Sequence, residues 1–312
     1  MMSAAVRHIP VMLKKVLEYL SPKDNEVYVD ATFGNGGYTE AILNAAKCKV
    51  IALDRDPSVI TRAQEIKSAY GDRFEFRAGT FGNFADLVTE NINGAVFDIG
   101  VSSMQLDDDF RGFSFSKKAL LDMRMSMSGA SAKDIVNTYS EKDLADIIYR
   151  YGEEKKSRQI AAKIIQYRKE KEIETTTELA DLIYQVMPKR FGQIDPATRT
   201  FQALRIAVND ELSELQRGLE GASQRILPEG RLVVVDFHSL EDRIVKDFFS
   251  ANADKRVHTS RYASATPEIK SDKIFEFASK AIIPSDEEAK QNPRSRSAKL
   301  RYAVKRKELN HE

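Results

Sequence analysis

The chain has 312 residues, of which 42% are hydrophobic and 30% charged, so it is too apolar to be disordered and long enough to bury a core without disulfides or metals. The length predicts two domains, or one long domain that carries an insertion. The single cysteine, Cys48, excludes an internal disulfide and a cysteine-cluster zinc site. The net charge is +1. The overall charge alone argues neither for nor against a polyanionic partner.

Two features bear on where the protein acts. The longest apolar runs, such as residues 232–235, are far shorter than the roughly 18 residues that span a bilayer, and the first residues lack a basic stretch followed by an apolar core. One cysteine suits a reducing compartment. We therefore expect a cytoplasmic protein without a membrane partner.

The first hundred residues alternate between two kinds of segment. Apolar runs that predict buried strands are separated by stretches with helical spacing, which predicts a parallel α/β sheet with helices on both faces. The expected strands are 26–30, 49–54, 74–77 and 94–98, and the expected helices follow residue 37 and cover about 57–68 and 84–89.

The apolar spacing becomes helical between about Asp107 and Asp195, and no strand pattern interrupts it. Thr175 and Glu178 are spaced as a capping box before one of these helices. A stripe from Phe201 to Leu219 predicts one long helix that ends at Gly221. We therefore expect an all-helical insertion within a discontinuous core.

The sheet pattern resumes with a strand at 230–236 and a helix that Ser239 opens as a capping box with Asp242. The predicted domains are then a first part of the core, a helical insertion with a role in substrate recognition, and a second part of the core with a basic C-terminal segment. Their ranges are 1–107, 108–210 and 211–312.

The basic C-terminal segment, residues 291–307, contains seven Lys or Arg residues and no acid. Such a run is often only a solvated tail. Its Asn-Pro-Arg-Ser-Arg-Ser opening and its apolar Leu300, Tyr302 and Val304 instead favour a loop that feeds a strand. That arrangement would fix the arginines against a surface.

A strand, a glycine-rich turn at 33–37, a helix and then Asp54 at the end of the next strand are typical of a nucleotide site. A dinucleotide fingerprint would have glycine at Thr39, which disfavours a nicotinamide-dependent oxidoreductase. The Asp30 carboxylate leads into the turn and suits a cationic ligand, such as the amino-acid end of S-adenosylmethionine. The plain alternative is a glycine loop that only turns the chain.

Eight ordered motifs resemble those of the MraW (RsmH) family of small-subunit ribosomal RNA cytidine N4-methyltransferases. The resemblance runs from about His8 to Lys305, nearly the whole chain. The motifs are His8-Ile-Pro-Val11, Asp30-Ala-Thr-Phe-Gly-Asn-Gly-Gly37, Asp98-Ile-Gly-Val-Ser-Ser-Met-Gln-Leu-Asp107, Arg111-Gly-Phe-Ser-Phe115, Leu121-Asp-Met-Arg-Met125, Phe201-Gln-Ala-Leu-Arg-Ile206, Phe237-His-Ser-Leu-Glu-Asp-Arg243 and Asn292-Pro-Arg-Ser-Arg-Ser-Ala298.

The resemblance implies a class I S-adenosylmethionine-dependent methyltransferase (Rossmann-like) sheet with an inserted all-helical domain. It implies methylation of the exocyclic N4 of one decoding-centre cytidine of 16S rRNA, with the small ribosomal subunit as the context. Carried over by motif, the residues expected to bind S-adenosyl-L-methionine are Gly36, Gly37, Tyr38, Asp54, Phe81, Asp98 and Gln105.

The chain departs from the family pattern at two positions. The family often has His where Tyr38 stands and often Ser where Asp236 precedes the Phe-His-Ser motif. Tyr38 retains a hydrogen-bond donor and a backbone amide, so we expect cofactor binding to survive the change. Asp236 adds a carboxyl group at a strand end, and the sequence assigns it no effect.

Amine methylation needs in-line positioning, an acceptor for the amine and a route for one proton, but no covalent intermediate. Asp98, at the end of its strand, is the expected catalytic acceptor, and Ser102 or Ser103 could share this work. A carbon-5 pyrimidine methyltransferase would need a cysteine nucleophile, and Cys48 lies at a predicted helix-to-strand junction. No metal is expected.

The expected contacts to the substrate RNA are Arg111, His238, Arg294, Arg296 and Arg301. His238 follows a strand end beside the site, although such a histidine is more often a structural hydrogen-bonding group. Arg111 lies near Phe113 and Phe115, and cation and aromatic faces together suit RNA; packing of the insertion against the core is the equal alternative. The alternating Met123, Met125 and Met127 are best explained as core filling.

A function of another class stays open, namely a non-catalytic RNA-binding factor for ribosome assembly on the same fold. Such a factor would be expected to have lost Asp54, Asp98 or the glycine turn, and all three are present. The sequence leaves monomer and homodimer equally open, as it does naked RNA and the assembled subunit as substrate.

Overall fold

The computed structural model describes residues 10–102, 104, 105, 108, 110–254 and 272–307. His8 and Ser103 lie outside the described residues. The chain forms two compact units, one from residues 1–100 with 212–312 and the other from residues 101–211. The boundaries expected from sequence, after residues 107 and 210, fall within seven residues of these. We refer to the two as the sheet unit and the helical unit.

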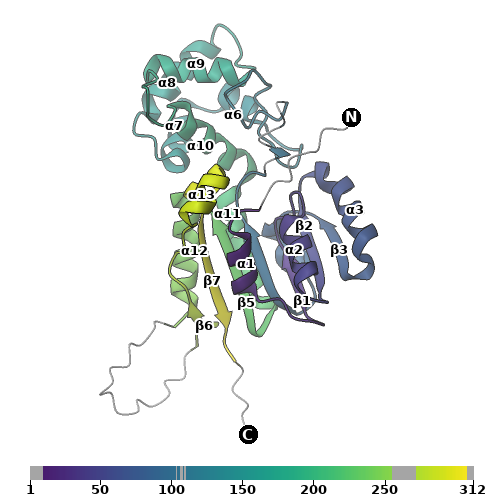
Figure 1. Cartoon of the computed structure of the whole chain (residues 1–312). Coiled ribbons are helices and arrows are strands. Elements are labelled where there is room, and N and C mark those ends of the chain that lie inside the picture. The colour runs from purple at the N-terminus through teal and green to yellow at the C-terminus, as the bar shows by residue number, and fades with distance from the viewer. Residues whose placement is uncertain (1–9, 103, 106–107, 109, 255–271, 308–312) are drawn as a thin grey trace, which may run out of the picture. The chain divides into compact units, whose positions relative to one another are not determined.

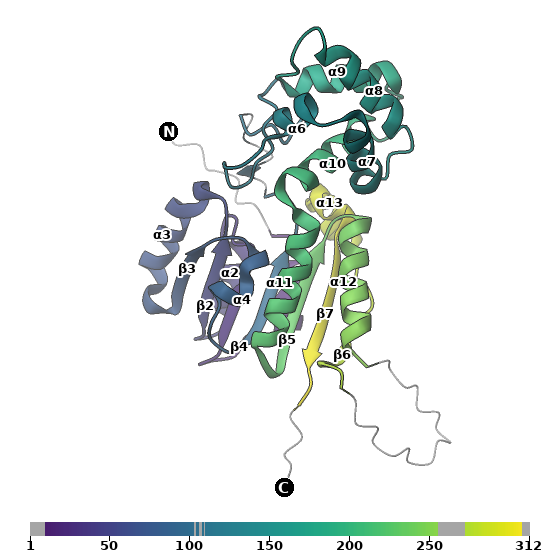
Figure 2. The same cartoon turned by 180° about the vertical axis from the view of Figure 1, so that it is seen from behind.

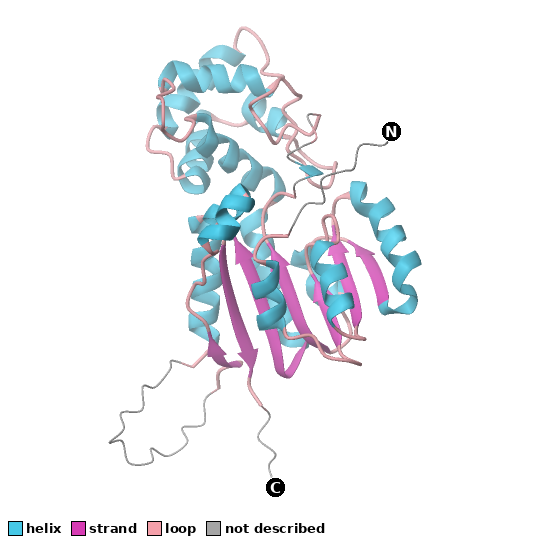
Figure 3. Ribbon diagram, in the orientation of Figure 1, coloured by secondary structure: helices cyan, strands magenta, loops and turns pink. Residues whose placement is uncertain are grey.

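The sheet unit is built on a seven-stranded sheet in the order β3-β2-β1-β4-β5-β7-β6. Its first five strands in this order are parallel, β7 is antiparallel to β5, and β6 is antiparallel to β7, as the arrow directions in Figure 3 show. The strands are β1 Val27–Asp30, β2 Lys49–Asp54, β3 Phe74–Ala78, β4 Ile92–Asp98, β5 Ile226–Asp236, β6 Phe275–Ala278 and β7 Lys299–Lys305. The sequence patterns predicted all of these strands except β6.

Helices cover both faces of this sheet (Figures 1 and 2). Side chains alternate along β5, so Val233 and Val235 join one hydrophobic core while Leu232 and Val234 join the other. The first core is covered by α1 Leu13–Leu20, α2 Gly37–Ala45 and α3 Ile60–Tyr70, and the second by α4 Phe84–Leu87, α11 Glu211–Arg225 and α12 Ser239–Asn252. The shorter helices are η1 Pro57–Val59, η2 Gly71–Arg73, η3 Phe81–Asn83, α13 Asp286–Gln291 and η4 Pro293–Ser297.

Pairing of β4 with β5 joins the two parts of the chain that form the sheet unit. The paired residues run from Gly94 with Arg231 to Asp98 with Val235. The core is therefore discontinuous in sequence and continuous in space.

The helical unit contains, in its described part, no strand beyond an isolated bridge between Leu120 and Thr175. Thr175 and Glu178 form the expected capping box, with hydroxyl and carboxylate each bonded to the other's backbone amide. The helices are α6 Ala132–Thr138, α7 Glu141–Gly152, α8 Ser157–Arg168, α9 Thr176–Val186 and α10 Ala197–Asn209. Among the described helices, none combines the length and apolar character needed to cross a membrane.

The long helix predicted between Phe201 and Gly221 is wrong. Asp210 adopts a left-handed conformation (φ 50°) that ends α10, and α11 begins at the next residue. Asp tolerates this conformation better than most residues, and the apolar stripe continues on both sides, so periodicity could not reveal the break. Gly221 does not end α11, which runs on to Arg225; a Cβ there would lie 3.0 Å from the Ala85 backbone nitrogen.

Candidate active site

Four aspartates end four neighbouring strands of the sheet. Asp30 is the last residue of β1, Asp54 of β2, Asp98 of β4 and Asp236 of β5, and these strands are adjacent and parallel. The carboxyl ends of parallel strands share one edge, where ligands of open α/β sheets bind. This edge is the candidate active site.

Asp30 is fully buried and held by its neighbours along the chain. Its carboxylate accepts hydrogen bonds from the Thr39 hydroxyl (2.7 Å) and the Thr32 amide (3.2 Å). Burial raises the pKa of Asp30 to about 6, and the Asp54 carboxylate adds to the rise. The sequence indicated that Asp30 suits a cationic ligand, from its position after an apolar strand and before the glycine turn, but Asp30 was not included in the predicted cofactor set.

Asp98 has a carboxyl oxygen, Oδ1, that is buried and accepts no hydrogen bond from any described residue. Its backbone amide donates to the Thr32 hydroxyl at 2.7 Å, which fixes the end of β4 beside the end of β1. Burial, followed by the charges of Asp30 and Glu241, raises the pKa of Asp98 to about 8. A buried carboxyl oxygen without a donor is costly. The Tyr38 hydroxyl also interacts with the Asp98 carboxyl, but the unbonded Oδ1 still favours a cationic or hydrogen-bond-donating ligand.

Asp54 is held more completely. Its two carboxylate oxygens accept hydrogen bonds from the amides of Gly34 (2.8 Å) and Asp56 (2.9 Å), and burial raises its pKa. Each carboxylate oxygen can accept two hydrogen bonds. Asp54 is therefore oriented by the backbone and retains capacity for ligand hydroxyl groups.

The glycines of the turn are required first by packing inside the chain. Gly36 has φ 74°, and a Cβ on it would lie 2.5 Å from Ile66 Cδ1, while a Cβ on Gly37 would lie 2.3 Å from Pro10 Cγ. Gly36 also caps α2 without a side-chain hydrogen bond. The first amides of α2, those of Gly37 and Tyr38, have no acceptor within the helix and carry the positive end of its dipole.

The phenol of Tyr38 is used inside the protein. The side chain is buried, and its hydroxyl donates a hydrogen bond to the Val11 carbonyl oxygen. Burial and the nearby Asp98 carboxyl raise the pKa of Tyr38 well above its ordinary value. The donor expected of Tyr38 toward a ligand is thus its backbone amide and not its hydroxyl.

Of two further residues in the predicted cofactor set, Phe81 belongs to the sheet unit and Gln105 to the helical unit. Phe81 begins η3 after β3, is half-buried, and packs edge-on against Phe97 with ring centroids 5.8 Å apart. Gln105 and Ser102 each accept a hydrogen bond from the other's amide (3.0 and 3.2 Å). The geometry at the sheet edge thus concerns the aspartates, the turn and Phe81.

α12 begins at Ser239 as predicted, but its N-cap is His238, so the predicted capping box of Ser239 with Asp242 is wrong. His238 Nδ1 accepts from the Glu241 amide at 3.4 Å, and Glu241 Oε2 accepts from the His238 amide at 3.2 Å, so the pair forms the capping box. Imidazole Nδ1 replaces the usual hydroxyl here, which the sequence pattern could not show. A substrate-positioning role for His238 stays a prediction beside this structural one.

Asp236 is fully buried, and neither of its carboxyl oxygens has a hydrogen-bond partner among the described residues. Burial and the carboxylates of Asp242 and Glu241 raise the pKa of Asp236 to about 8. It is therefore a neutral acid over most of the physiological pH range. Sequence reasoning noted Asp236 as a departure but assigned it no role.

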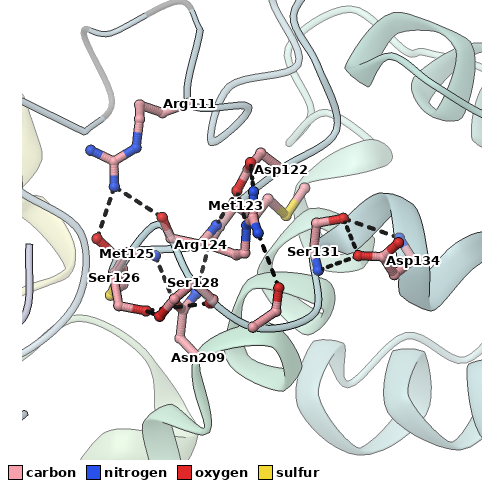
Figure 4. A network of polar contacts seen from close by, with 11 residues as sticks. Arg111, Asp122, Met123, Arg124, Met125, Ser126, Ser128, Ser131, Asp134 and Asn209 are labelled. Carbon is pink, nitrogen blue, oxygen red and sulfur yellow. Dashed lines mark hydrogen bonds and ion pairs between the residues drawn. The ribbon is translucent and has the colours of Figure 1, made fainter.

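Arg111 is a structural residue of the helical unit (Figure 4). It is 8% exposed, and its Nη2 donates to the carbonyl oxygens of Arg124 (2.9 Å) and Met125 (3.0 Å). Its guanidinium also lies 5.7 Å from the Phe113 ring centroid. These contacts give Arg111 a structural role inside the insertion, and its contact with RNA stays a prediction.

The basic C-terminal segment forms the expected loop and strand, as η4 and β7. Arg301 is engaged inside the protein. Its Nε and Nη2 donate to the Asp242 carboxylate at 2.9 and 2.8 Å, and Lys299 donates to the same carboxylate at 2.7 Å. Arg296 is exposed and Arg294 is partly exposed. Of the three predicted phosphate contacts, Arg294 and Arg296 retain accessible side chains.

Cys48 is 1% exposed and directly precedes β2. It therefore lies at the opposite end of that strand from Asp54, away from the edge that carries the aspartates. A cysteine nucleophile at the candidate site is excluded.

Residues 5–306 match the model of the MraW methylase family. The chain belongs to this family. Similar proteins named ribosomal RNA small subunit methyltransferase H occur in Rickettsia bellii (strain OSU 85-389), 53% identical over 96% of this chain and 98% of the relative, and in Rickettsia massiliae (strain Mtu5), 53% identical over 95% and 97%. Among solved structures, an rRNA methylase from Streptococcus thermophilus has 13% identity and a TM-score of 0.41, and the match covers 95% of this chain and 94% of that one.

Family membership confirms the fold class predicted from sequence. The doubly wound sheet of the sheet unit is that of a class I methyltransferase, and the helical unit is inserted between β4 and β5. As a member of a methylase family, the chain is a methyltransferase that uses S-adenosylmethionine.

Proposed function

We propose that this methyltransferase transfers the methyl group of S-adenosylmethionine to the exocyclic N4 of a decoding-centre cytidine in 16S rRNA. Membership in the MraW methylase family and the names of the relatives point to the RNA of the small ribosomal subunit. We take the substrate to be that RNA within the subunit.

The row of aspartates at the sheet edge supports the choice of cofactor. Three of these acids, Asp30, Asp54 and Asp98, are buried with raised pKa values, so each gains from a positively charged or hydrogen-bond-donating ligand. S-adenosylmethionine carries an ammonium and a sulfonium, whereas a dinucleotide pyrophosphate would be repelled. The cofactor carboxylate suits the free amides of Gly37 and Tyr38 at the start of α2.

The remaining roles follow from the positions of the side chains. Asp54 accepts hydrogen bonds from ribose hydroxyls, as its retained acceptor capacity allows. Phe81, which follows β3, lies on the side of Asp54 expected for the adenine. Gln105 completes the cofactor set by resemblance, and the helical unit takes the role of substrate recognition. Arg294 and Arg296 contact phosphates of the RNA.

The single observation that carries the chemistry is the unpartnered Oδ1 of Asp98. S-adenosylmethionine supplies a methyl group that its sulfonium already activates. Asp98, which a bound cation would hold in its ionised form, accepts a hydrogen bond from the N4 amine and so draws its lone pair out of conjugation with the ring. The nitrogen–carbon bond forms as the carbon–sulfur bond breaks, and the amine loses one proton toward Asp98 or solvent.

The test is methyl transfer from labelled S-adenosylmethionine to small subunits and naked 16S rRNA that lack the modification, followed by nucleoside analysis. We expect N4-methylcytidine at the decoding centre with wild-type protein, formed about 10²- to 10³-fold more slowly with Asp98→Asn. The matched control is Asp122→Asn, which changes an acid of the helical unit that is already fully engaged by Arg124. Cofactor binding without transfer to either RNA would favour the non-catalytic assembly factor, and methylation at carbon 5 would exclude the proposed chemistry.

A further inference from the structure

The connection between α9 and α10, both labelled in Figure 1, carries the most exposed aromatic side chain among the described residues. Seven consecutive residues, 188–194, are exposed, and we refer to them as the 188–194 loop. Phe191 in this loop is fully exposed and Ile194 is 79% exposed. By contrast, Phe201 in the following helix is buried against Phe115. Single exposed apolar residues are common on protein surfaces, so Phe191 indicates an interaction only together with the geometry and charge around it.

The base of the loop is fixed by a polar cluster centred on Asp195. Its carboxylate accepts hydrogen bonds from the Tyr184 hydroxyl (3.1 Å) and the Ala197 amide (2.9 Å), and it forms an ion pair with Lys189 (3.1 Å). The Lys189 ammonium also lies 4.2 Å from the centroid of the Tyr184 ring. Gly192, with φ 75°, makes the turn between these anchors. Phe191 is therefore presented on a braced loop.

Basic side chains surround this loop within the helical unit. Lys156, just before α8, donates to the Val186 carbonyl at the end of α9 (3.4 Å), and Arg199 in α10 donates to the Glu153 carbonyl (3.4 Å). The corner at 153–156 therefore lies beside both ends of the loop. Five basic residues gather here against three acids, and these are Lys155, Lys156, Lys189, Arg190 and Arg199, with Glu153, Glu154 and Asp195.

Two of the three acids are withdrawn from the surface. Glu154 is 5% exposed and lies 3.8 Å from Arg199, and Asp195 is held by Lys189. Lys155, Lys156 and Arg190 remain exposed. The surface around Phe191 therefore presents excess positive charge, which is complementary to a phosphate backbone.

We propose that the 188–194 loop binds an unpaired segment of the substrate RNA, with Phe191 stacked on an exposed base and Arg190, Lys155 and Lys156 on the flanking phosphates. An aromatic face beside cations is the combination with which proteins hold unstacked RNA bases. This inference rests on the proposed function, because it takes ribosomal RNA as the substrate, and it assigns part of the recognition to one loop. A protein partner is disfavoured because exposed lysines are depleted at the centre of protein interfaces.

The experiment compares Phe191→Ser, Phe191→Tyr and a matched control in RNA binding and in methyl transfer. Tyr139→Ser is the control, since Tyr139 is a partly exposed aromatic residue of the same unit. Tyr139 precedes the 12-residue helix α7 and the 153–156 corner follows it. The length of this helix therefore separates the two by about 18 Å. We expect Phe191→Ser to raise the Kd for naked 16S rRNA, and the KM for subunits, about 5- to 100-fold. Phe191→Tyr should have the wild-type Kd for naked RNA and the wild-type KM for subunits. In both variants kcat, the Kd for S-adenosylmethionine and Tm should stay unchanged.

Each other outcome has one meaning. Equal RNA affinity of Phe191→Ser and wild type would overturn the proposal. Weaker binding to subunits with unchanged binding to naked RNA would assign Phe191 to a ribosomal protein and would also overturn it. If wild-type protein bound RNA but transferred no methyl group, the proposed function would fail. The ratio of the Kd values of Phe191→Ser and wild type for naked 16S rRNA would still test the role of the loop.

Discussion

Two pairs of aspartates, one pair in each unit of this protein, are held in opposite ways. In the sheet unit, Asp98 and Asp236 end neighbouring strands with carboxyl oxygens that no described residue bonds, and burial raises the pKa of each to about 8. In the helical unit, Asp122 and Asp134 are bonded by Arg124 and Ser131, which lowers the pKa of each.

The difference separates binding from scaffolding. A network whose donors and acceptors are all used, such as that of Figure 4, stabilises a loop and has little left to offer a ligand. A buried acid that lacks partners costs stability until something binds it. Unmet hydrogen bonds therefore locate function here better than charge or burial alone.

The largest expected effect comes from exchanging one acid in each unit for its amide. Asp98→Asn should lower kcat for methyl transfer about 10²- to 10³-fold with Tm unchanged or raised, because a neutral amide suits its buried position. Asp122→Asn should lower Tm but leave turnover per folded molecule near that of wild type. Transfer kinetics and thermal melts of both variants test this prediction. Loss of turnover in Asp122→Asn but not in Asp98→Asn would contradict the assignment of function to Asp98 and of structure to Asp122.

The next effect tests the helical network directly. Asn209 is 5% exposed; it accepts from the Met125 amide (2.8 Å) and donates to the carbonyl oxygens of Met123 (2.8 Å) and Arg205 (2.9 Å). Asn209→Ala leaves the buried Met125 amide and Met123 carbonyl oxygen without their partner and should lower the free energy of unfolding by about 2–4 kcal/mol. Urea denaturation measures this. Ser128→Ala in the same loop, whose hydroxyl is exposed, should change it by less than about 0.5 kcal/mol, and equal losses would argue against the network.

A pH titration sharpens the contrast within the sheet edge. The pKa of Asp98 is raised to about 8, and a cationic cofactor binds better to its ionised form. The Kd for S-adenosylmethionine should therefore fall, by at most about tenfold per pH unit, as pH rises from about 6.5 to 8, and level off above that range. Calorimetric titration of Asp98→Asn should show no such slope, whereas Asp236→Asn should keep it. A slope that survives in Asp98→Asn would assign the titration elsewhere.

Asp236 offers a smaller effect on stability. Its folded-state pKa of about 8 lies above the ordinary value of 3.8, so unfolding releases its proton at intermediate pH. This group's contribution to stability therefore falls as pH rises from about 4 to 8 and is constant beyond. Asp236→Asn lacks that fall. At pH 8.5 the stability of this variant relative to wild type should be higher than at pH 4, by at least about 1 kcal/mol. Parallel stability curves for the two proteins would refute the assignment.

The smallest effect separates the two kinds of arginine in the basic segment. Arg296→Gln should reduce the slope of log K for RNA against log salt by about 0.7–0.9 without a change in Tm. Arg301→Gln should lower Tm, since it breaks the bond to Asp242, and leave the slope unchanged. Filter binding at several salt concentrations measures the slopes. A lower slope for Arg301→Gln would show that its ion pair opens on the RNA.

The sequence predicted the strand ends well because their signals are local. An apolar run followed at once by an acid predicts both a buried strand and the position of its carboxylate, as at Asp54 and Asp98. The loop and strand of the basic segment were predicted for the same reason. A family resemblance added the chemistry, which periodicity alone could not supply.

What the sequence did not reveal depends on partners distant along the chain. Arg111 meets the carbonyls of Arg124 and Met125, and Arg301 meets Asp242, 59 residues away; neither pairing has a sequence signature, so both arginines were predicted to face RNA. The left-handed Asp210 interrupts a helix without interrupting its apolar stripe. A histidine that replaces the usual capping hydroxyl, as His238 does, escapes the capping-box pattern.

The insertion of the helical unit between β4 and β5 has a consequence for biosynthesis. β4 ends at Asp98 and β5 begins at Ile226. At a synthesis rate of about 5–20 residues per second, roughly 6–25 seconds pass between the synthesis of β4 and that of β5, the strand that pairs with it. During that interval a central strand, apolar on both faces, behaves as an exposed edge. The helical unit, which residues 101–211 form, emerges whole in the meantime. Translation speed and chaperone capture at this edge thus become part of how the enzyme reaches its native state.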